Sequence, residues 1–133
     1  MPEREMEVKG VIYSDLGRAA SFTEIDWVKR QLKEKVGVEP YPGTLNILAD
    51  DPESLGNLKI LRDSPGIEII PEVENFCTAY CYKVLVEGRI SGAIIIPHVS
   101  DYPLAKLEIV APVSIKETLG VKDGDCISVR IFL

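Results

Sequence analysis

The sequence predicts a mainly β protein whose strands close, or nearly close, into a barrel with two helical insertions. Many short apolar and β-branched runs follow one another at close spacing, bounded by Gly, Pro or acidic residues. Helical signatures interrupt this series at two places, whereas a parallel α/β sheet would need a helix between most strands. The length of 133 residues fits one domain, which we expect to span residues 8–133 after an N-terminal tail of residues 1–7.

Strand-like runs account for most of the chain. The two longest flank Glu87 and Gly88, a turn pair that predicts a β-hairpin. The acidic stretch 49–57, which contains Pro and Gly, is interpreted as a surface loop. The predicted strands are residues 8–13, 44–48, 58–61, 67–70, 78–86, 89–96, 107–110 and 126–132.

Two capping-box sequences predict the helices. The first begins at Ser21 and precedes apolar residues at helical intervals up to Gly37, where we expect the helix to stop. The apolar residues of this helix are Ile25, Val28, Leu32 and Val36. The second capping box pairs Ser114 with Glu117 and predicts a short helix that ends near Gly120.

Composition and charge limit the partners of the chain. The formal net charge of −6 argues against binding to a nucleic-acid backbone, but it permits a small anionic ligand that needs only a few local cations. No apolar run is long enough to span a bilayer, so we expect no membrane partner and a cytoplasmic location. Cys77, Cys81 and Cys126 lack paired spacing, which favours buried free thiols over disulfides or a zinc site.

The hexapeptide 41–46, Tyr-Pro-Gly-Thr-Leu-Asn, is the most informative local motif. If Thr44 opens a strand, Thr44 and Asn46 point to the same face and place a hydroxyl and an amide oxygen side by side. Two such neutral oxygens suit Mg²⁺, which takes its other ligands from water and phosphates. The alternative is a plain turn into a strand, in which Asn46 bonds to nearby backbone.

Read in order, these segments resemble the archaeal CTP-dependent riboflavin kinases. The resemblance covers residues 8–132, and its specific blocks are residues 39–46 (EPYPGTLN), 92–97 (GAIIIP), 107–112 (LEIVAP) and 122–125 (KDGD). It implies a six-stranded cradle-loop β-barrel, related to the RIFT barrels. It also implies transfer of a phosphoryl group from CTP to riboflavin, giving FMN and CDP with Mg²⁺ as cofactor.

The resemblance also implies site residues. Thr44 and Asn46 match metal ligands of the family, and Glu108 matches its flavin-binding Glu. Ser100 replaces a Thr that contacts the flavin, and it keeps the hydroxyl. Glu108 is also the nearest candidate for a general base. The implied nucleotide-binding residues are Asp15, Leu16, Gly17, Arg18, Ala19, Ala20, Val113, Ser114, Ile115, Lys116, Glu117 and Thr118.

The first loop departs from the family pattern. The resemblance implies a G-x-G-x-G loop around the nucleotide, but residues 15–19 read Asp-Leu-Gly-Arg-Ala, so only Gly17 remains. Ala19 resists a positive φ and its Cβ hinders close approach to phosphate. Asp15 adds a carboxylate that repels phosphate, and Arg18 either offsets this charge or lies in solvent. Because of this departure from the family pattern, flavin binding is better supported than CTP binding.

Three functions follow from these observations. The first is riboflavin phosphorylation. The second is a kinase-inactive barrel of the same fold that binds a flavin, a nucleotide or a protein partner. The third, a DNA-binding barrel with a similar turn at residues 122–125, is disfavoured by the acidic composition.

Two further residues have no assigned role in these functions. His98, the single histidine, follows a predicted strand and is either a ligand contact or an ordinary surface residue. Trp27 is interpreted as a packing residue.

Overall fold

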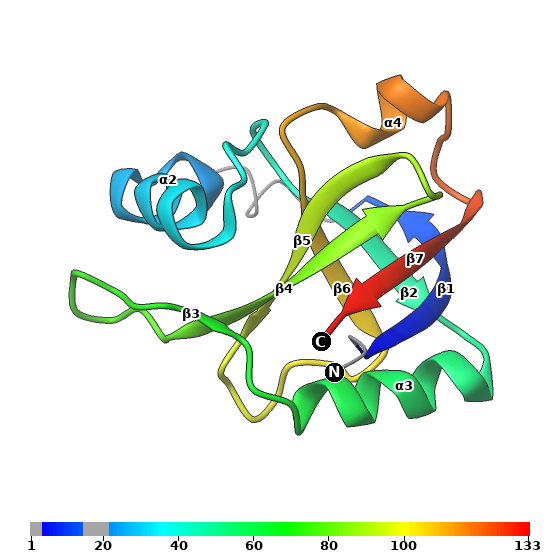
Figure 1. The fold of residues 1–133 in the computed structure, drawn as a ribbon, viewed down its shortest axis with the longest axis horizontal. Coiled ribbons are helices and arrows are strands. Elements are labelled where there is room, and N and C mark those ends of the chain that lie inside the picture. The colour runs from blue at the N-terminus through cyan, green and yellow to red at the C-terminus, as the bar shows by residue number, and fades with distance from the viewer. Residues whose placement is uncertain (1–3, 15–21) are drawn as a thin grey trace.

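The computed structural model describes residues 4–14 and 22–133 (Figure 1). Within these residues, six antiparallel strands form a closed barrel in the order β4-β5-β6-β2-β1-β7, and β4 pairs with β7 to close it. The strands are β1 (Glu5–Tyr13), β2 (Leu45–Ala49), β4 (Ala79–Val86), β5 (Ile90–Pro97), β6 (Lys106–Val110) and β7 (Cys126–Phe132). A further strand, β3 (Ile67–Ile69), pairs with the outer edge of β4. The barrel prediction and the β4–β5 hairpin are confirmed.

Two apolar clusters cover the two faces of the barrel wall. The interior cluster includes Leu45 and Ile47 of β2 and Leu107 and Ile109 of β6, all almost fully buried. Burial of each such side chain contributes about 1.5–3 kcal/mol. Alternate residues of the same strands therefore point outward. The second cluster covers part of this outer face, where helical residues pack against β4, β5 and β6.

The two predicted helices are present. The first comprises α2 (Asp26–Gln31) and a π-helical turn, η1 (Leu32–Val36), and it ends at Gly37, whose φ is +81°. Ser21, where its capping box was predicted, lies outside the described residues. The second is α4 (Ile115–Leu119), in which the Glu117 N–H donates to Ser114 Oγ at 3.3 Å. It ends at Gly120 with φ +67°, so this capping prediction is confirmed.

A further helix, α3 (Pro52–Arg62), corrects the prediction of a loop at 49–57 and a strand at 58–61. Asp51 caps it, because its Oδ1 accepts a hydrogen bond of 2.8 Å from the Ser54 N–H. This bond holds the pKa of Asp51 below its usual value. Leu58 and Leu61 are buried at helical spacing against the barrel. The Asp-Pro start was a helix signal, and the short apolar run at 58–61 was misread as a strand.

Smaller differences concern the first strand and the cysteines. β1 begins at Glu5, which pairs with Phe132, so the N-terminal tail is shorter than predicted. Cys81 is buried, but Cys77 and Cys126 are exposed, so the prediction of buried thiols holds for one of three. Among the described residues, no helix is both long and apolar enough to cross a membrane.

The helices lie at different places around the barrel. α3 lies across one end and α4 at the opposite end, near the turn into β7 (Figure 1). α2 lies beside the barrel wall, next to the segment of β3 that projects away from it (Figure 1). Asn46 of β2 and Glu108 of β6, two of the predicted site residues, lie opposite each other on the outer face of these strands.

Candidate active site

A row of polar residues crosses three neighbouring strands on the outer face of the barrel. Tyr13 of β1 lies opposite Asn46 of β2, and Asn46 lies opposite Glu108 of β6. Directly paired residues share a face, and their neighbours Ile47 and Leu107 point into the interior core. The register of three strands thus brings an amide and a carboxylate together from positions 62 residues apart in sequence.

Thr44 and Asn46 contribute two buried oxygens that lack a hydrogen-bond partner in the described structure, Thr44 Oγ1 and Asn46 Oδ1. An unsatisfied buried polar atom costs about 1–3 kcal/mol. Both oxygens are neutral hard donors of the kind that Mg²⁺ accepts, and a cation bound between them would satisfy both. The residues predicted as metal ligands therefore fit that role, and the alternative of an Asn46 oxygen bonded to nearby backbone does not apply.

Glu108 is oriented by its neighbours. The Tyr102 hydroxyl donates a hydrogen bond of 2.7 Å to Glu108 Oε2, and Lys106 Nζ lies 3.9 Å from Oε1. Burial, and then the bond to Glu108, raise the pKa of Tyr102 far above its usual value, so this tyrosine stays a hydrogen-bond donor. The Arg62 guanidinium carbon lies 5.2 Å from the centroid of the Tyr102 ring. The carboxylate is thus held by one donor and one cation.

An apolar cavity of about 290 Å³ opens beside Thr44 and Glu108. Besides these two residues, its polar lining comes from Asn75 and Cys77. Its remaining walls are apolar or aromatic, and they comprise Phe22, Phe76, Ala79, Ile95 and Pro97. A cavity with mainly apolar walls and a few polar groups suits a planar ring system that carries a hydroxylated chain.

A second, smaller cavity of about 130 Å³ lies on the other side of Thr44. The Pro-Gly turn of residues 41–43 forms one wall, and the predicted nucleotide residues Val113, Ser114, Ile115 and Lys116 form another. Glu117 and Thr118 lie farther along α4, and their N–H groups bond to Ser114. Thr44 lines both cavities, and its Oγ1 is one of the two buried oxygens without a partner in the described structure.

The ends of the first loop lie next to this smaller cavity. Lys116 Nζ is 2.7 Å from Asp123 Oδ1 and 3.4 Å from the hydroxyl of Ser14, the last described residue before the loop. At the other end of the loop, Thr23 Oγ1 accepts a hydrogen bond of 2.9 Å from the Gly43 N–H. Hydrogen bonds from Lys116 and Ser14 lower the pKa of Asp123. Asp15, Leu16, Gly17, Arg18, Ala19 and Ala20 lie outside the described residues.

Ser100 does not line the cavity that Glu108 lines. It lies in the turn after β5 and borders a different cavity of about 710 Å³, together with Tyr80, Tyr82 and His98. His98 packs edge-on against Tyr80, with ring centroids 5.4 Å apart. Pro97 lines both cavities. The structure thus separates the two residues predicted to bind flavin, because one belongs to the barrel wall and the other to a turn.

Sequence reasoning missed several residues of the apolar cavity. Asn75 and Phe76 lie in a stretch for which no structure was predicted. Tyr102, which donates a hydrogen bond to Glu108, was not among the predicted site residues either. An aromatic residue within the acidic segment 71–77 was the available signal, because an exposed Phe among charged residues often marks a binding surface. Trp27, predicted to be a packing residue, is buried in the outer cluster.

Comparisons with known proteins agree with this architecture. The family model CTP-dep_RFKase, described as "Domain of unknown function DUF120", matches residues 12–131. The chain is 34% identical over 98% of its length to a riboflavin kinase of Archaeoglobus fulgidus, and 36% identical over 93% to one of Pyrobaculum aerophilum. It spans 57% and 60% of those two proteins, respectively. A riboflavin kinase of Saccharolobus solfataricus is 31% identical over 96% of the chain, which covers 75% of that relative. The chain belongs to the CTP-dep_RFKase (DUF120) family.

Proposed function

We propose that this chain transfers a phosphoryl group from CTP to riboflavin, giving FMN and CDP. Its family membership and the riboflavin kinases that it resembles support this activity. The observation that carries the proposal is the position of Thr44 at the junction of two cavities, with a buried oxygen that has no partner among the described residues. A phosphoryl donor and an acceptor must meet at such a junction.

Each cavity has the chemistry of one substrate. The apolar cavity would hold the isoalloxazine ring of riboflavin, with the ribityl chain directed toward Glu108 and Thr44. The smaller cavity would hold the nucleotide phosphates between the turn at Gly43 and the start of α4, where Ser114 and Lys116 are the polar side chains. The two reacting groups would then come together beside Thr44.

Thr44 and Asn46 would hold Mg²⁺, which when bound supplies positive charge against the charge of the transferring phosphoryl group. Glu108 accepts a hydrogen bond from Tyr102 through Oε2, which leaves Oε1 to bind a ribityl hydroxyl in competition with Lys106. In this arrangement Glu108 orients the acceptor hydroxyl and is the candidate for a general base. Positioning of donor and acceptor provides most of the catalysis, as is general for phosphoryl transfer.

The test is formation of FMN from riboflavin and Mg²⁺ with each of CTP, ATP, GTP and UTP, followed by chromatography. We expect product with CTP and none when the metal is chelated. Product with ATP but not CTP would contradict the proposed donor. For variants at Asn46, the matched control in this assay is Leu48→Ala, because Leu48 lies on the same face of the same strand as Asn46 but is exposed.

A kinase-inactive flavin-binding barrel is the second candidate. It is favoured by the pairing of Lys116 with Asp123, which occupies the cation nearest the smaller cavity, and by Asp15 and Ala19 in place of loop glycines. Riboflavin binding without product from any of the four nucleotides would favour this function over the kinase.

A further inference from the structure

We propose that the connection between β3 and β4, residues 70–78, is a flavin-recognition arm in which Phe76 stacks on the isoalloxazine ring and Gln31 is the positioning residue. This inference rests on the proposed function, since it assigns a specificity role within the same apolar cavity. The arm lies outside the barrel, on the side covered by α2 (Figure 1).

Phe76 has the environment of a ligand contact. Its side chain lines the apolar cavity together with Thr44 and Glu108, yet the residue is 43% exposed. Its ring centroid lies 5.5 Å from that of Trp27 with the planes at 85°, so Trp27, which is only 7% exposed, supports it from below the surface. An aromatic ring supported on one side and exposed to an apolar cavity is suited to stack on a planar heteroaromatic ligand.

The backbone before Phe76 is turned by an unusual conformation. Asn75 has a φ of +73°, the left-handed region that non-glycine residues rarely adopt and that Asn tolerates best. Asn75 and Cys77 also line the cavity, so three successive residues of the arm border it. Such conformations persist where the surrounding structure holds them, and they are concentrated in segments that contact ligands.

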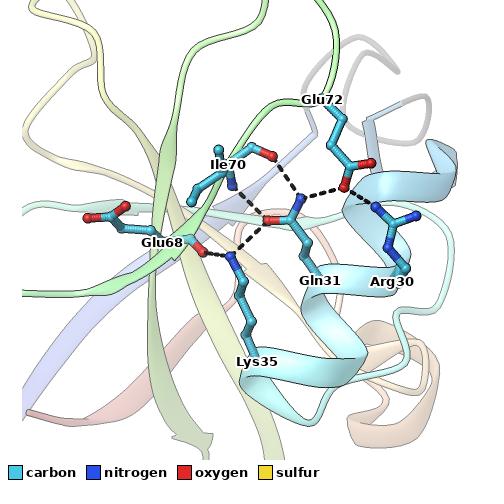
Figure 2. Close-up of polar contacts among 6 residues, drawn as sticks. All are labelled: Arg30, Gln31, Lys35, Glu68, Ile70 and Glu72. Atoms are coloured by element: carbon cyan, nitrogen blue, oxygen red, sulfur yellow. Dashed lines mark hydrogen bonds and ion pairs between the residues drawn. The ribbon is translucent and has the colours of Figure 1, made fainter.

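Gln31 holds the start of the arm (Figure 2). Its Oε1 accepts from the Ile70 N–H at 2.7 Å, and its Nε2 donates to the Ile70 carbonyl oxygen at 2.7 Å. β3 ends at Ile69, so the amide of Gln31 continues the backbone pairing that the strand itself no longer makes. Gln31 is 6% exposed and buried in α2, which makes this a fixed anchor at the start of the arm.

Charged neighbours extend the anchor along the arm. Gln31 Nε2 also donates to Glu72 Oε2 at 3.1 Å, and Arg30 forms an ion pair with the same carboxylate (Figure 2). Lys35 Nζ donates to Gln31 Oε1 at 3.2 Å and to the Glu68 carbonyl oxygen at 2.9 Å. Every polar atom of the Gln31 side chain is therefore used to hold the arm against α2 and η1. Gln31 does not line the cavity, so its effect on a ligand must pass through the arm.

The apolar cavity favours the flavin ring over the cytosine ring as the partner of Phe76. The side chains of Ala79, Ile95 and Pro97, which also line the cavity, offer no hydrogen bonds to an exocyclic amine. The polar lining residues are Thr44, Asn75, Cys77 and Glu108, and the other five are apolar or aromatic. A large tricyclic ring with a polar chain at one end matches this distribution better than a small polar base.

The experiment measures riboflavin affinity by quenching of its fluorescence, and the KM values of riboflavin and CTP. For Phe76→Ala we expect riboflavin binding to weaken about tenfold, as for loss of one stacking contact, with the KM of CTP changed less than about twofold. Phe76→Tyr restores the affinity. Val73→Ala is the matched control, because Val73 is an exposed residue of the same arm that does not line the cavity, and it should bind riboflavin like the natural chain.

The role of Gln31 is tested by a double-mutant cycle. Gln31→Ala should weaken riboflavin binding severalfold while Phe76 is present. It should cause little further loss of affinity once Phe76 is replaced by alanine, because both changes remove the same contact between Phe76 and the flavin. Circular dichroism and thermal unfolding verify that Gln31→Ala is folded. Additive losses would overturn its positioning role, and an unchanged affinity for Phe76→Ala or an equal change in both KM values would overturn the stacking role.

These outcomes are separable from failure of the proposed function. If the natural chain binds riboflavin but forms no FMN, the kinase proposal fails while the binding comparison of Phe76→Ala with Val73→Ala still decides the role of the arm. If the natural chain does not bind riboflavin at all, both proposals are wrong.

Discussion

The barrel wall around Asn46 and the arm that carries Phe76 border one cavity, but they are positioned by different interactions. Asn46 and Glu108 are held by backbone pairing across β1, β2 and β6, with core residues packed directly behind them. The arm begins where the pairing of β3 ends, at Ile69, and its first residues are held by side chains of α2. In the proposed function, the metal ligand Asn46 and the flavin ligand Glu108 would belong to the rigid barrel wall, and the stacking contact to the flavin would belong to the arm.

The largest effect is expected at Asn46. Asn46→Ala should lower the kinase rate by about tenfold or more while riboflavin affinity stays nearly unchanged, because the change removes a metal ligand and no flavin contact. Steady-state kinetics and fluorescence quenching measure the two quantities. Leu48→Ala serves as the control, and an equal loss of rate and affinity in Asn46→Ala would contradict the metal assignment.

Glu108→Gln should weaken riboflavin binding by about fivefold, since it removes the charge from an acceptor but keeps its shape. Tyr102→Phe removes the donor that orients the carboxylate, and we expect a smaller loss of the same kind. Quenching titrations compare the three proteins. Affinity that is unaffected by both changes would remove Glu108 from the flavin site.

Thr44→Val tests the cost of the oxygen at the junction of the cavities. Without metal or nucleotide, the variant should be more stable than the natural chain by about 1 kcal/mol, since valine replaces a buried hydroxyl that has no partner among the described residues. Urea unfolding in the presence of a chelator measures this difference. We also expect the kinase rate of the variant to fall even though its stability rises. A variant that is less stable than the natural chain would mean that Thr44 Oγ1 has a structural role.

The smallest effect is expected for the ion pair at the surface of the arm. Arg30→Gln should change the free energy of unfolding by less than about 0.5 kcal/mol, because both side chains are about half exposed. Riboflavin affinity should stay within about twofold, since Gln31 still holds Ile70 and Glu72. A loss as large as that of Gln31→Ala would show that charge, and not the buried amide, positions the arm.

The elements with strong local signals were predictable. The β4–β5 hairpin follows from its alternating apolar residues and turn pair, and α4 follows from the capping pair Ser114 and Glu117. The helix α3 was missed although Asp51 and Pro52 form a helix start, because the apolar residues of its last turns also fit a short strand. Whether such a short segment forms a helix or a strand depends on its packing as well as on its local propensity.

The amino-acid pattern alone was sufficient for the barrel class and the family resemblance, because period-two alternation and turn residues are local properties. Three features depended on packing. They are the cross-strand pairing of Asn46 with Glu108, the position of Ser100 at a different cavity from Glu108, and the arm held by Gln31. Each requires contacts between residues distant in sequence. The register of non-neighbouring strands and the partner of a buried amide are set by the closure of the whole barrel, which no local window of sequence contains.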